Sequence, residues 1–299
     1  MPSISVVITT YNRVQFLQRA IQSALEAGSE LEVVVVDDCS TDNTSEVCAK
    51  RSDIRYVRLG ANHGLAYARN VGIAESSSEF VAFLDDDDLR LPGSLDKQLS
   101  RMVADQRIAL CYGQALIGDA HRQLPTGEIY PIECPQGDVF WELLEDNFIP
   151  MPSVLVRKSD LLDTGGFNTA LPLIEDWDLW LRISERFLVA AVEEPLAIHR
   201  KASADSKQMS SDSGALCRHA SRVQQMALSR TRAQTAARSK RRHVRTRFRD
   251  HAYNVLMTEA TNLIRDGDAK SARAKLLDAF HFRPFRAVAS GRLPWLLIK

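Results

Sequence analysis

The sequence has few cysteines and no pairing pattern among them. Its five cysteines, in 299 residues, are odd in number and contain no Cys-x-x-Cys spacing, so neither a disulfide framework nor a clustered-thiol zinc site is indicated. Reduced thiols are typical of a cytosolic protein, and a cytoplasmic location is expected. No run approaches the ~20 apolar residues of a membrane-spanning helix. The N-terminus leads into a strand-like segment, so no signal peptide is expected.

Net charge is also lacking. Lys plus Arg and Asp plus Glu both number 38, so total charge indicates no partner. The distribution is uneven, because acids cluster before residue 200 while residues 218–249 are almost purely basic. Apolar residues make up 45% of the chain, which is typical of a soluble globular protein with one large domain, or a main domain with an appendage.

The chain is organised around an acidic run. Residues 80–84 predict a buried strand, and four consecutive aspartates follow at 85–88. Like charges packed at a strand end repel and raise one another's pKa values, and a divalent cation would remove that cost. Carboxylates are hard oxygen ligands that suit Mg²⁺ or Mn²⁺. The alternative is a solvated acidic turn before a helix that begins at Pro92.

Strands alternate with helices in the first part of the chain. The β-rich segments are residues 4–11, 31–38, 54–59 and 80–84. This alternation predicts an α/β fold with a mostly parallel sheet flanked by helices. Because such sheets bind ligands at the carboxyl ends of their strands, Tyr11, Asp38 and the acidic run are expected at one edge.

Further elements are expected after the acidic run. They are a helix over 92–105, a strand over 108–117, a loop over 118–135, a short helix over 137–147 and a strand over 153–156. The loop prediction rests on Pro125, Gly127 and Pro131, which break regular structure.

Four short motifs occur in order over roughly the first 90 residues. They are Thr9-Thr10-Tyr11-Asn12-Arg13, Val36-Asp37-Asp38-x-Ser40-x-Asp42, Asn62-x-Gly64-x-x-x-Ala68-Arg69-Asn70-x-Gly72 and Phe83-Leu84-Asp85-x-Asp87-Asp88. Together they resemble the successive signatures of family-two glycosyltransferases, which are inverting nucleotide-sugar enzymes of the GT-A fold. The resemblance implies a metal-dependent enzyme of cell-surface glycan biosynthesis that moves a sugar to an acceptor hydroxyl.

The resemblance also implies roles for individual residues. Contacts with the donor nucleotide are implied for Thr9, Tyr11, Arg13, Asp38, Arg69 and Asp86. Asp85 and Asp87 would form the metal-binding D-x-D and hold Mn²⁺ or Mg²⁺. The register of this pair is open by one residue, because Asp86 between them is also an acid. Without the other motifs, Asp38 would be interpreted as a helix N-cap and Arg69 as a solvated side chain.

A second part of the resemblance lies downstream. A Gly-Gly-Phe turn at 165–167 precedes Glu175 and Asp176, which open an amphipathic helix. This is similar to the family's acceptor-side motif, and it implies that Asp176 is the catalytic base. Backbone amides and the dipole at a helix N-terminus favour the ionised carboxylate that a base requires. The alternative is that Glu175 and Asp176 only stabilise the helix start.

This sequence departs from the common pattern of the family in two features. The Gln-x-x-Arg-Trp motif and the membrane spans of polysaccharide synthases are not found, so a processive synthase is not expected. Many relatives also place a His near the end of the catalytic domain, at the metal or diphosphate. His199 is the nearby candidate metal ligand here, although it is out of register with the commonest form, and a structural His is the alternative.

The resemblance ends near residue 205. We expect a catalytic domain over 1–205 and a basic helical extension over 215–299, with helices at 215–264 and 269–280 separated by an Asp-Gly-Asp break. The tail, 282–299, interleaves aromatic and basic residues. Either it docks on the anionic inner face of a membrane, or it packs on the catalytic domain.

Two other functions fit part of the sequence. A nucleotidyltransferase could use a similar sheet and metal, but its expected Gly-rich phosphate loop is missing from residues 9–13. A nucleic-acid-binding protein would act through residues 218–249, and this partner is the less expected one. The partners that we expect are a UDP-, GDP- or dTDP-sugar donor and a glycan or lipid-linked acceptor. The sequence specifies neither the base, the sugar nor the acceptor.

Overall fold

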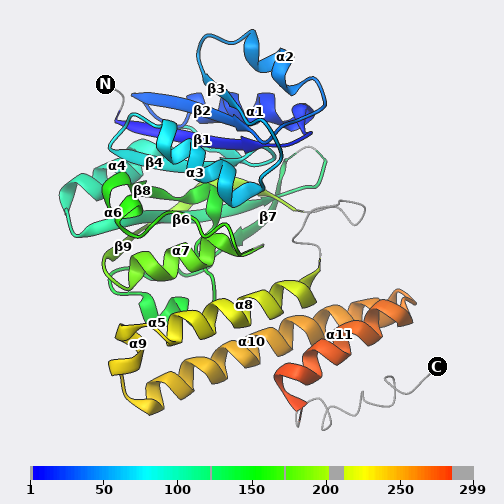
Figure 1. The fold of residues 1–299 in the computed structure, drawn as a ribbon. Coiled ribbons are helices and arrows are strands. Elements are labelled where there is room, and N and C mark those ends of the chain that lie inside the picture. The colour runs from blue at the N-terminus through cyan, green and yellow to red at the C-terminus, as the bar shows by residue number, and fades with distance from the viewer. Residues whose placement is uncertain (1–2, 122, 172, 202–211, 285–299) are drawn as a thin grey trace. The chain divides into compact units, whose positions relative to one another are not determined.

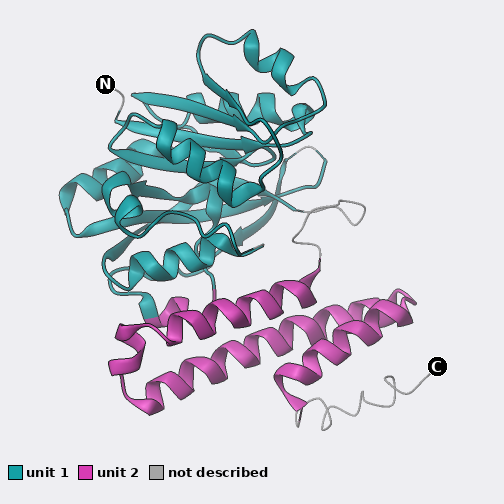
Figure 2. Ribbon diagram, viewed as in Figure 1, with its two compact units in different colours: residues 1–140, 147–205 teal, residues 141–146, 206–299 magenta. Residues whose placement is uncertain are grey.

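The computed structural model describes residues 3–121, 123–171, 173–201 and 212–284 (Figure 1). Its chain divides into two compact units, which Figure 2 shows in different colours. Unit 1 contains residues 1–140 and 147–205, and unit 2 contains residues 141–146 and 206–299.

Within the described residues, unit 1 is built on a nine-stranded sheet. Its strands are β1 Ile4–Thr10, β2 Leu31–Asp37, β3 Arg55–Arg58, β4 Phe80–Asp85, β5 Leu89–Arg90, β6 Ile108–Gly118, β7 Pro125–Tyr130, β8 Leu155–Arg157 and β9 Leu188–Arg200. They lie in the order β3-β2-β1-β4-β8-β6-β9-β5, and β7 pairs with β6. The helices before residue 200 are α1 Val14–Leu25, α2 Thr44–Ala49, α3 Leu65–Glu75, α4 Ser94–Ala104, α5 Phe140–Leu143, η1 Met151–Ser153, α6 Lys158–Asp163 and α7 Glu175–Ser184.

The order of the first four strands reverses beside β1. β1 pairs in parallel with both β2 and β4, and β2 pairs in parallel with β3. The chain therefore moves outward from β1 to β3 and then returns to the other side of β1. Loops that leave such a point diverge and create a ligand crevice at the carboxyl edge. Thr10 pairs with Asp37 and Thr9 with Asp85, so the motif ends meet at this edge.

Alternating side chains give the sheet two covered faces. In β4, Phe80, Ala82 and Leu84 pack into the core cluster that contains residues of α1 and α4. Phe83 points to the opposite face, where its ring lies 5.1 Å from that of Phe167. Because side chains alternate along a strand, Asp85 lies on the same face as Phe83.

Helices α3 and α7 cover the face that carries Asp85 (Figure 1). Gly72 of α3 lies so close to β1 that an added Cβ would come within 2.2 Å of a Val7 methyl group, which explains the glycine. Phe167 also contacts Trp180 of α7, with 6.4 Å between ring centroids. These contacts bring both helix starts close to the carboxyl edge of the sheet.

The α/β prediction is confirmed, and the first four strands are parallel as expected. Beyond them the sheet is mixed, because β8 runs antiparallel to β4 and β6 while β9 runs parallel to β6. The prediction of an unbroken loop over 118–135 is wrong, since β7 forms an antiparallel hairpin with β6. All six residues of β7 are exposed, so no buried face marked it as a strand in the sequence.

Beyond residues 141–143 of α5, the described residues of unit 2 contain four helices. They are α8 Ser213–Leu228, α9 Thr231–Thr235, α10 Arg238–Arg265 and α11 Ala269–Phe282. The expectation of one helix over 215–264 is wrong, because the chain leaves the helical conformation at 229–230 and again at 236–237. The predicted break after α10 is confirmed, with Gly267 at φ 83°.

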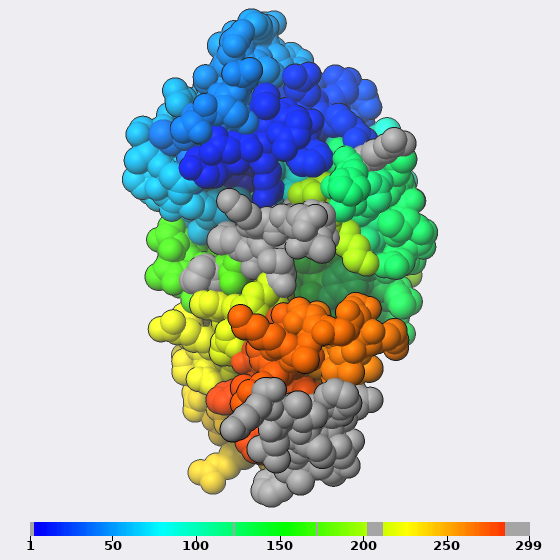
Figure 3. All heavy atoms as spheres, turned by 90° about the vertical axis from the view of Figure 1, so that its right-hand side faces the viewer, coloured from blue at the N-terminus to red at the C-terminus, as the bar shows by residue number. Residues whose placement is uncertain are grey.

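The core of unit 2 is formed by buried side chains of α8, α10 and α11. Phe248 of α10 contacts Phe282 of α11 edge to face, with 6.2 Å between centroids. Val223, Leu256 and Leu276 are also buried. Figure 3 shows the later part of α10 and α11 as orange and red atoms in close contact. No described helix in either unit is long and apolar enough to cross a membrane.

Candidate active site

Asp86 and Asp87 are buried and share one arginine. Arg13 Nη1 lies 3.3 Å from Asp86 Oδ1 and 2.9 Å from Asp87 Oδ2. The hydroxyl of Thr10 also donates to Asp86, at 2.7 Å. Burial and the charge of Asp87 raise the pKa of Asp86 to about 7, although Arg13 opposes the rise. Asp86 and Arg13, both predicted donor contacts, therefore bind each other directly.

Arg200, the last residue of β9, completes the pairing of the acidic run. Its guanidinium donates to Asp87 Oδ2 through Nε, at 3.1 Å, and through Nη2, while its backbone N–H donates to Asp88 Oδ1 at 2.8 Å. The guanidinium lies over the ring of Phe16, 4.6 Å from the centroid. This contact adds a cation–π attraction. Sequence analysis missed Arg200, and its one available signal was its position beside the candidate His199.

His199 does reach the acidic run. Its Nδ1 lies 3.0 Å from Asp88 Oδ2, and β5 fixes its position because Leu89 pairs with Ile198. The charge of Asp88 raises the pKa of His199 to about 9. A neutral His in this arrangement can bind a metal through Nε2, whereas the protonated form donates a hydrogen bond from Nε2. Half of the His199 side chain is exposed.

The protein itself supplies the positive charge that sequence analysis assigned to a metal ion. Arginines 13 and 200 hold Asp86 and Asp87, and His199 holds Asp88. In the described residues, no three His, Cys, Asp or Glu side chains form a group that could hold a metal ion. The described residues therefore do not form a complete metal site by themselves.

Asp85 has a different environment from the other three acids. Its Oδ1 accepts a hydrogen bond from Arg69 Nη2 at 2.7 Å, and 27% of its side chain is exposed. Within the described residues, no hydrogen bond reaches its second oxygen, Oδ2. Mg²⁺ is commonly held by one or two protein carboxylates together with substrate phosphates. The donor set at Asp85 fits a cation of that kind, shared with a diphosphate.

Arg69 connects Asp85 to the start of α7. Its Nη1 lies 2.6 Å from Glu175 Oε1, and Phe167 packs against the guanidinium with 5.4 Å between the guanidinium carbon and the ring centroid. Arg69 is 3% exposed and Glu175 is 5% exposed. The interpretation of Arg69 as a solvated side chain is therefore excluded. Glu175 is also more than a helix-start residue, because its carboxylate pairs with Arg69.

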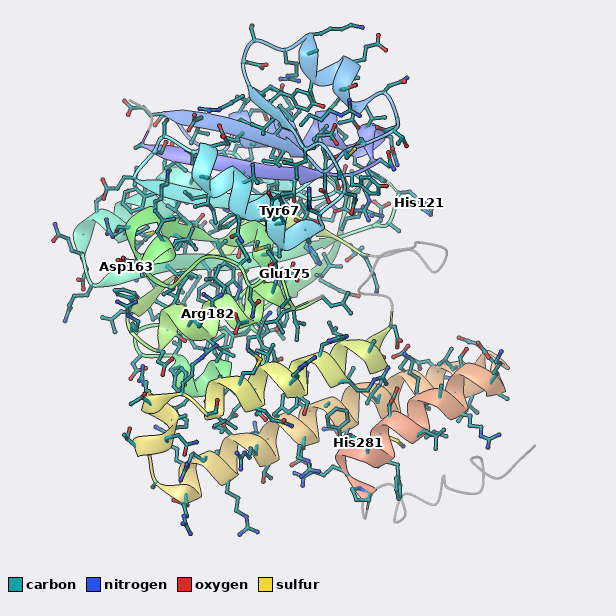
Figure 4. The ribbon with its side chains drawn as sticks, in the orientation of Figure 1. Tyr67, His121, Asp163, Glu175, Arg182 and His281 are labelled. Atoms are coloured by element: carbon teal, nitrogen blue, oxygen red, sulfur yellow. The ribbon has the colours of Figure 1, made fainter. Side chains whose placement is uncertain are left out.

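Asp176, the predicted base, directly follows Glu175. Its Oδ1 accepts the N–H of Trp177 at 2.6 Å, and Asn147 Nδ2 lies 3.4 Å from its Oδ2. Burial raises the pKa of Asp176 to about 6, and the charge of Glu175 adds to the rise while Arg69 opposes it. The helix-dipole argument predicted the opposite direction, and here burial outweighs it. Figure 4 shows Glu175 at the start of α7, on the same side of the sheet as Tyr67 of α3.

Asp38 holds the loop that leads into α3. Its two carboxylate oxygens accept the backbone N–H groups of His63 and Gly64, both at 2.8 Å. Gly64 has φ 88°, a conformation that glycine adopts without strain. The next helix, α2, begins at Thr44, so Asp38 is not the N-cap of that helix. Its contacts are made to the loop before α3 instead.

The other predicted nucleotide contacts lie at the end of β1. Tyr11 is 45% exposed. Thr9 pairs in register with Asp85, and in the described part of the chain its buried hydroxyl has no hydrogen-bond partner. Sequence analysis missed an exposed aromatic pair, His63 and Tyr67, whose ring centroids are 4.5 Å apart. Exposed rings beside a strand end can stack on a nucleotide base.

The fold is that of an α/β protein in which the motif residues meet at the carboxyl edge of the parallel part of the sheet. Residues 5–160, more than half of the chain, match the family described as Glycosyl transferase family 2. The chain belongs to this family, and the predicted family is confirmed.

Individual relatives agree with this membership. The chain is 29% identical over 196 residues to an uncharacterised glycosyltransferase of Haemophilus influenzae, covering 64% of this chain and 66% of that protein. It is 32% identical over 192 residues to the succinoglycan biosynthesis protein ExoU of Rhizobium meliloti, covering 60% and 56%. The matches to two Rickettsia glycosyltransferases cover 28% and 32% of those proteins. The chain thus matches less than two thirds of the length of these relatives.

Solved structures show the same fold. TarS of S. aureus in complex with UDP-GlcNAc superposes with a TM-score of 0.62 and 19% identity, covering 96% of this chain and 83% of that chain. The complex of TarS with UDP gives a TM-score of 0.61 and 18% identity. At this identity the likeness concerns the fold alone. It confirms the predicted GT-A fold with a helical C-terminal region.

Proposed function

We propose that this chain transfers a sugar, with inversion, from a nucleoside diphosphate donor to a hydroxyl group of a glycan acceptor. The observation that carries the proposal is the contact series from Asp85 through Arg69 to Glu175. It links the open carboxylate at the acidic edge to the helix start that presents Asp176. One end of the series suits a diphosphate with its cation, and the other end suits an acceptor hydroxyl.

Support for the donor class comes from the position of two predicted contacts and from structural neighbours. Tyr11 and the loop held by Asp38 lie at the carboxyl ends of β1 and β2, where α/β sheets bind nucleotides. TarS has been solved with UDP and with UDP-GlcNAc. We therefore propose a UDP-, GDP- or dTDP-sugar as the donor. ExoU is a succinoglycan biosynthesis protein, which supports an acceptor in cell-surface glycan synthesis.

Asp176 acts as the general base in this proposal. Its carboxylate takes the proton of the acceptor hydroxyl, and the acceptor oxygen then bonds to the anomeric carbon from the side opposite the diphosphate. The bond from that carbon to the diphosphate oxygen breaks in the same displacement, which inverts the configuration. A pKa of about 6 keeps Asp176 ionised at neutral pH and close to the pH at which a base works efficiently.

Positively charged side chains of the protein hold the acidic edge in place, where the diphosphate leaving group is expected. Asp85 would hold Mn²⁺ or Mg²⁺ together with the diphosphate, and such an ion supplies Lewis-acid stabilisation of the departing oxygen. With a pKa of about 9, His199 is protonated at neutral pH, so its Nε2–H would donate to the diphosphate. Asp87 contributes through Arg13 and Arg200, because its Oδ2 already pairs with both. Of the two aspartates in the predicted D-x-D, Asp85 is therefore the one that we propose to bind the metal ion directly.

The roles of the two parts of the chain are also a proposal. We propose that residues 1–205 perform the transfer and that residues 215–299 form an extension that is not needed for chemistry. Most of the tail, from residue 285 onward, lies outside the described residues, so the prediction that 282–299 contact a membrane stays a prediction. No observation favours a nucleotidyltransferase.

A thermal-shift panel followed by product analysis tests the function. UDP, GDP, dTDP and CMP are compared with and without Mn²⁺, because a ligand that binds the folded state raises its apparent stability. We expect one nucleoside diphosphate to raise the midpoint, more so with Mn²⁺, and the matching sugar donor to give a product of inverted anomeric configuration by NMR. A panel without any responding diphosphate would contradict the donor class. A retained configuration would contradict the single displacement.

A further inference from the structure

Four arginines form a stripe along one side of α10. Arg238, Arg242, Arg245 and Arg249 follow one another at intervals of four, three and four residues, which places them on one side of a helix. All four side chains are exposed. Val244 and Phe248, from the same part of the helix, are buried and are not part of the stripe. These four arginines are called the arginine stripe below.

The stripe has no acidic partner in the structure. In the part of the chain that the structure describes, no carboxylate pairs with any of the four guanidinium groups. Neighbouring basic residues differ, since Arg247 lies 3.3 Å from Glu145 and Arg283 lies 2.9 Å from Asp250. The sequence contains no Asp or Glu from residue 213 to 249. The stripe therefore presents uncompensated positive charge to solvent.

The surroundings of the stripe favour a lipid surface over a nucleic acid. Single-stranded nucleic acids are held on exposed aromatic rings, whereas Phe248 and Tyr253 of α10 are both buried. The stripe also runs along the open side of a single helix, and such a convex line of charge matches a flat anionic surface. Basic residues close to anionic headgroups contribute ~1 kcal/mol each.

The position of the last described residues also supports a lipid surface as the partner of the stripe. Arg283 donates to the Thr246 carbonyl at 2.8 Å and pairs with Asp250, so the described chain ends beside the stripe. From there the sequence continues into residues 285–299, which include the apolar run Trp-Leu-Leu-Ile at 295–298. Apolar residues next to exposed basic ones are typical of segments that bind at a membrane surface.

We propose that the arginine stripe docks unit 2 on an anionic phospholipid surface. None of the four arginines is among the donor and acceptor residues proposed above. It would hold the enzyme where a lipid-linked acceptor is found, but the docking itself does not depend on the transfer reaction.

Sedimentation of the full chain with lipid vesicles tests the proposal. Vesicles of phosphatidylcholine with phosphatidylglycerol are compared with vesicles of phosphatidylcholine alone, at low and at high salt. The test variant is Arg242→Gln with Arg245→Gln. The matched control is Arg265→Gln with Arg273→Gln, which removes the same charge from exposed positions at the other end of α10 and on α11. Circular dichroism, the thermal midpoint and the nucleotide shift are recorded for each, so that a misfolded variant is recognised.

We expect the unmodified chain to bind only the anionic vesicles, and less at high salt because screening shortens the range of the charges. Two side chains at ~1 kcal/mol each predict a partition ~10- to 30-fold weaker in the test variant. The control variant should bind almost as well as the unmodified chain. Nucleotide-induced thermal shifts should be equal in all three proteins, since the stripe takes no part in donor binding.

Three results would overturn the proposal. The first is that the unmodified chain does not sediment with anionic vesicles at low salt. The second is that the control variant loses as much binding as the test variant, because overall charge and not the stripe would then be responsible. The third is that duplex DNA or RNA binds through the stripe more tightly than the vesicles at the same salt, which would assign this surface to nucleic acid.

Discussion

Arg69 Nη1 and Glu175 Oε1 lie 2.6 Å apart although 106 positions separate the two residues in the chain. The same guanidinium holds Asp85 through Nη2. Both members of the pair are almost fully buried, so neither charge can be solvated if its partner is removed. The pair thus connects α3 to the start of α7 and fixes the spacing between the acidic edge and Asp176.

The first prediction concerns Arg69. Arg69→Met should lower the free energy of unfolding by ~3–5 kcal/mol, because it leaves a buried carboxylate without its partner. Urea denaturation measures the change. Arg186→Met is the control, since Arg186 is half exposed and lies 3.9 Å from Asp163, and a surface pair of this kind contributes ~0–1 kcal/mol. Equal losses in the two variants would contradict the importance of the buried pair.

The second prediction concerns Asp176. Asp176→Asn should lower sugar transfer by ~10²–10⁴-fold, because it removes the general base. Donor affinity should change little, since the diphosphate is expected at the acidic edge. Asp163→Asn, on an exposed carboxylate of α6, is the control and should leave transfer unchanged. Near-full transfer by the Asp176 variant, or loss of donor binding in parallel, would exclude Asp176 as the base.

The third prediction is the pH dependence of transfer. A base is active when ionised, and the pKa of Asp176 is raised to about 6. The rate should therefore be highest above pH ~6 and fall about tenfold per pH unit below that value. The effect on folding stability runs in the opposite direction to the effect on rate. A carboxyl group whose pKa is raised on folding stabilises the folded state at low pH, and this contribution is lost as pH rises through about 6.

Glu175→Gln tests how the charge of Glu175 affects the dependence of the transfer rate on pH. Because the charge of Glu175 contributes to the raised pKa of Asp176, its removal should shift the acid limb of the rate profile to lower pH. The measurement is kcat/KM across the acid range at saturating Mn²⁺. A limb that stays in place or moves to higher pH would show that Glu175 does not act on Asp176 through its charge.

The fourth prediction distinguishes Asp85 from Asp87. Asp85→Asn should remove most of the Mn²⁺-stimulated donor binding with little loss of stability, because the side chain is partly exposed. Asp87→Asn should lower the unfolding free energy, because Arg13 and Arg200 lose a buried partner. Thermal shift with UDP or GDP, with and without Mn²⁺, measures both effects. Unchanged metal dependence after Asp85→Asn would contradict its role as a ligand.

Local sequence was sufficient for much of the fold. β1, β2 and β4 consist mainly of apolar and β-branched residues, which is typical of strands covered on both faces. β7 gave no such signal, because its six residues are exposed and pairing with β6 alone makes it a strand. The long strand β9 also went unassigned, since Pro195 and shifts in its register with β6 interrupt the alternation on which such assignments depend.

The candidate site divides in the same way. The sequence by itself determined the order of the elements and the acids at the strand ends, because apolar runs, turn residues and consecutive aspartates are local properties of the chain. Only the tertiary structure decided which charges meet. Arg200 pairs with Asp87 across 113 positions. That pairing depends on strand order and burial, which bring distant residues together where an unpaired charge would be costly, and no local pattern records this.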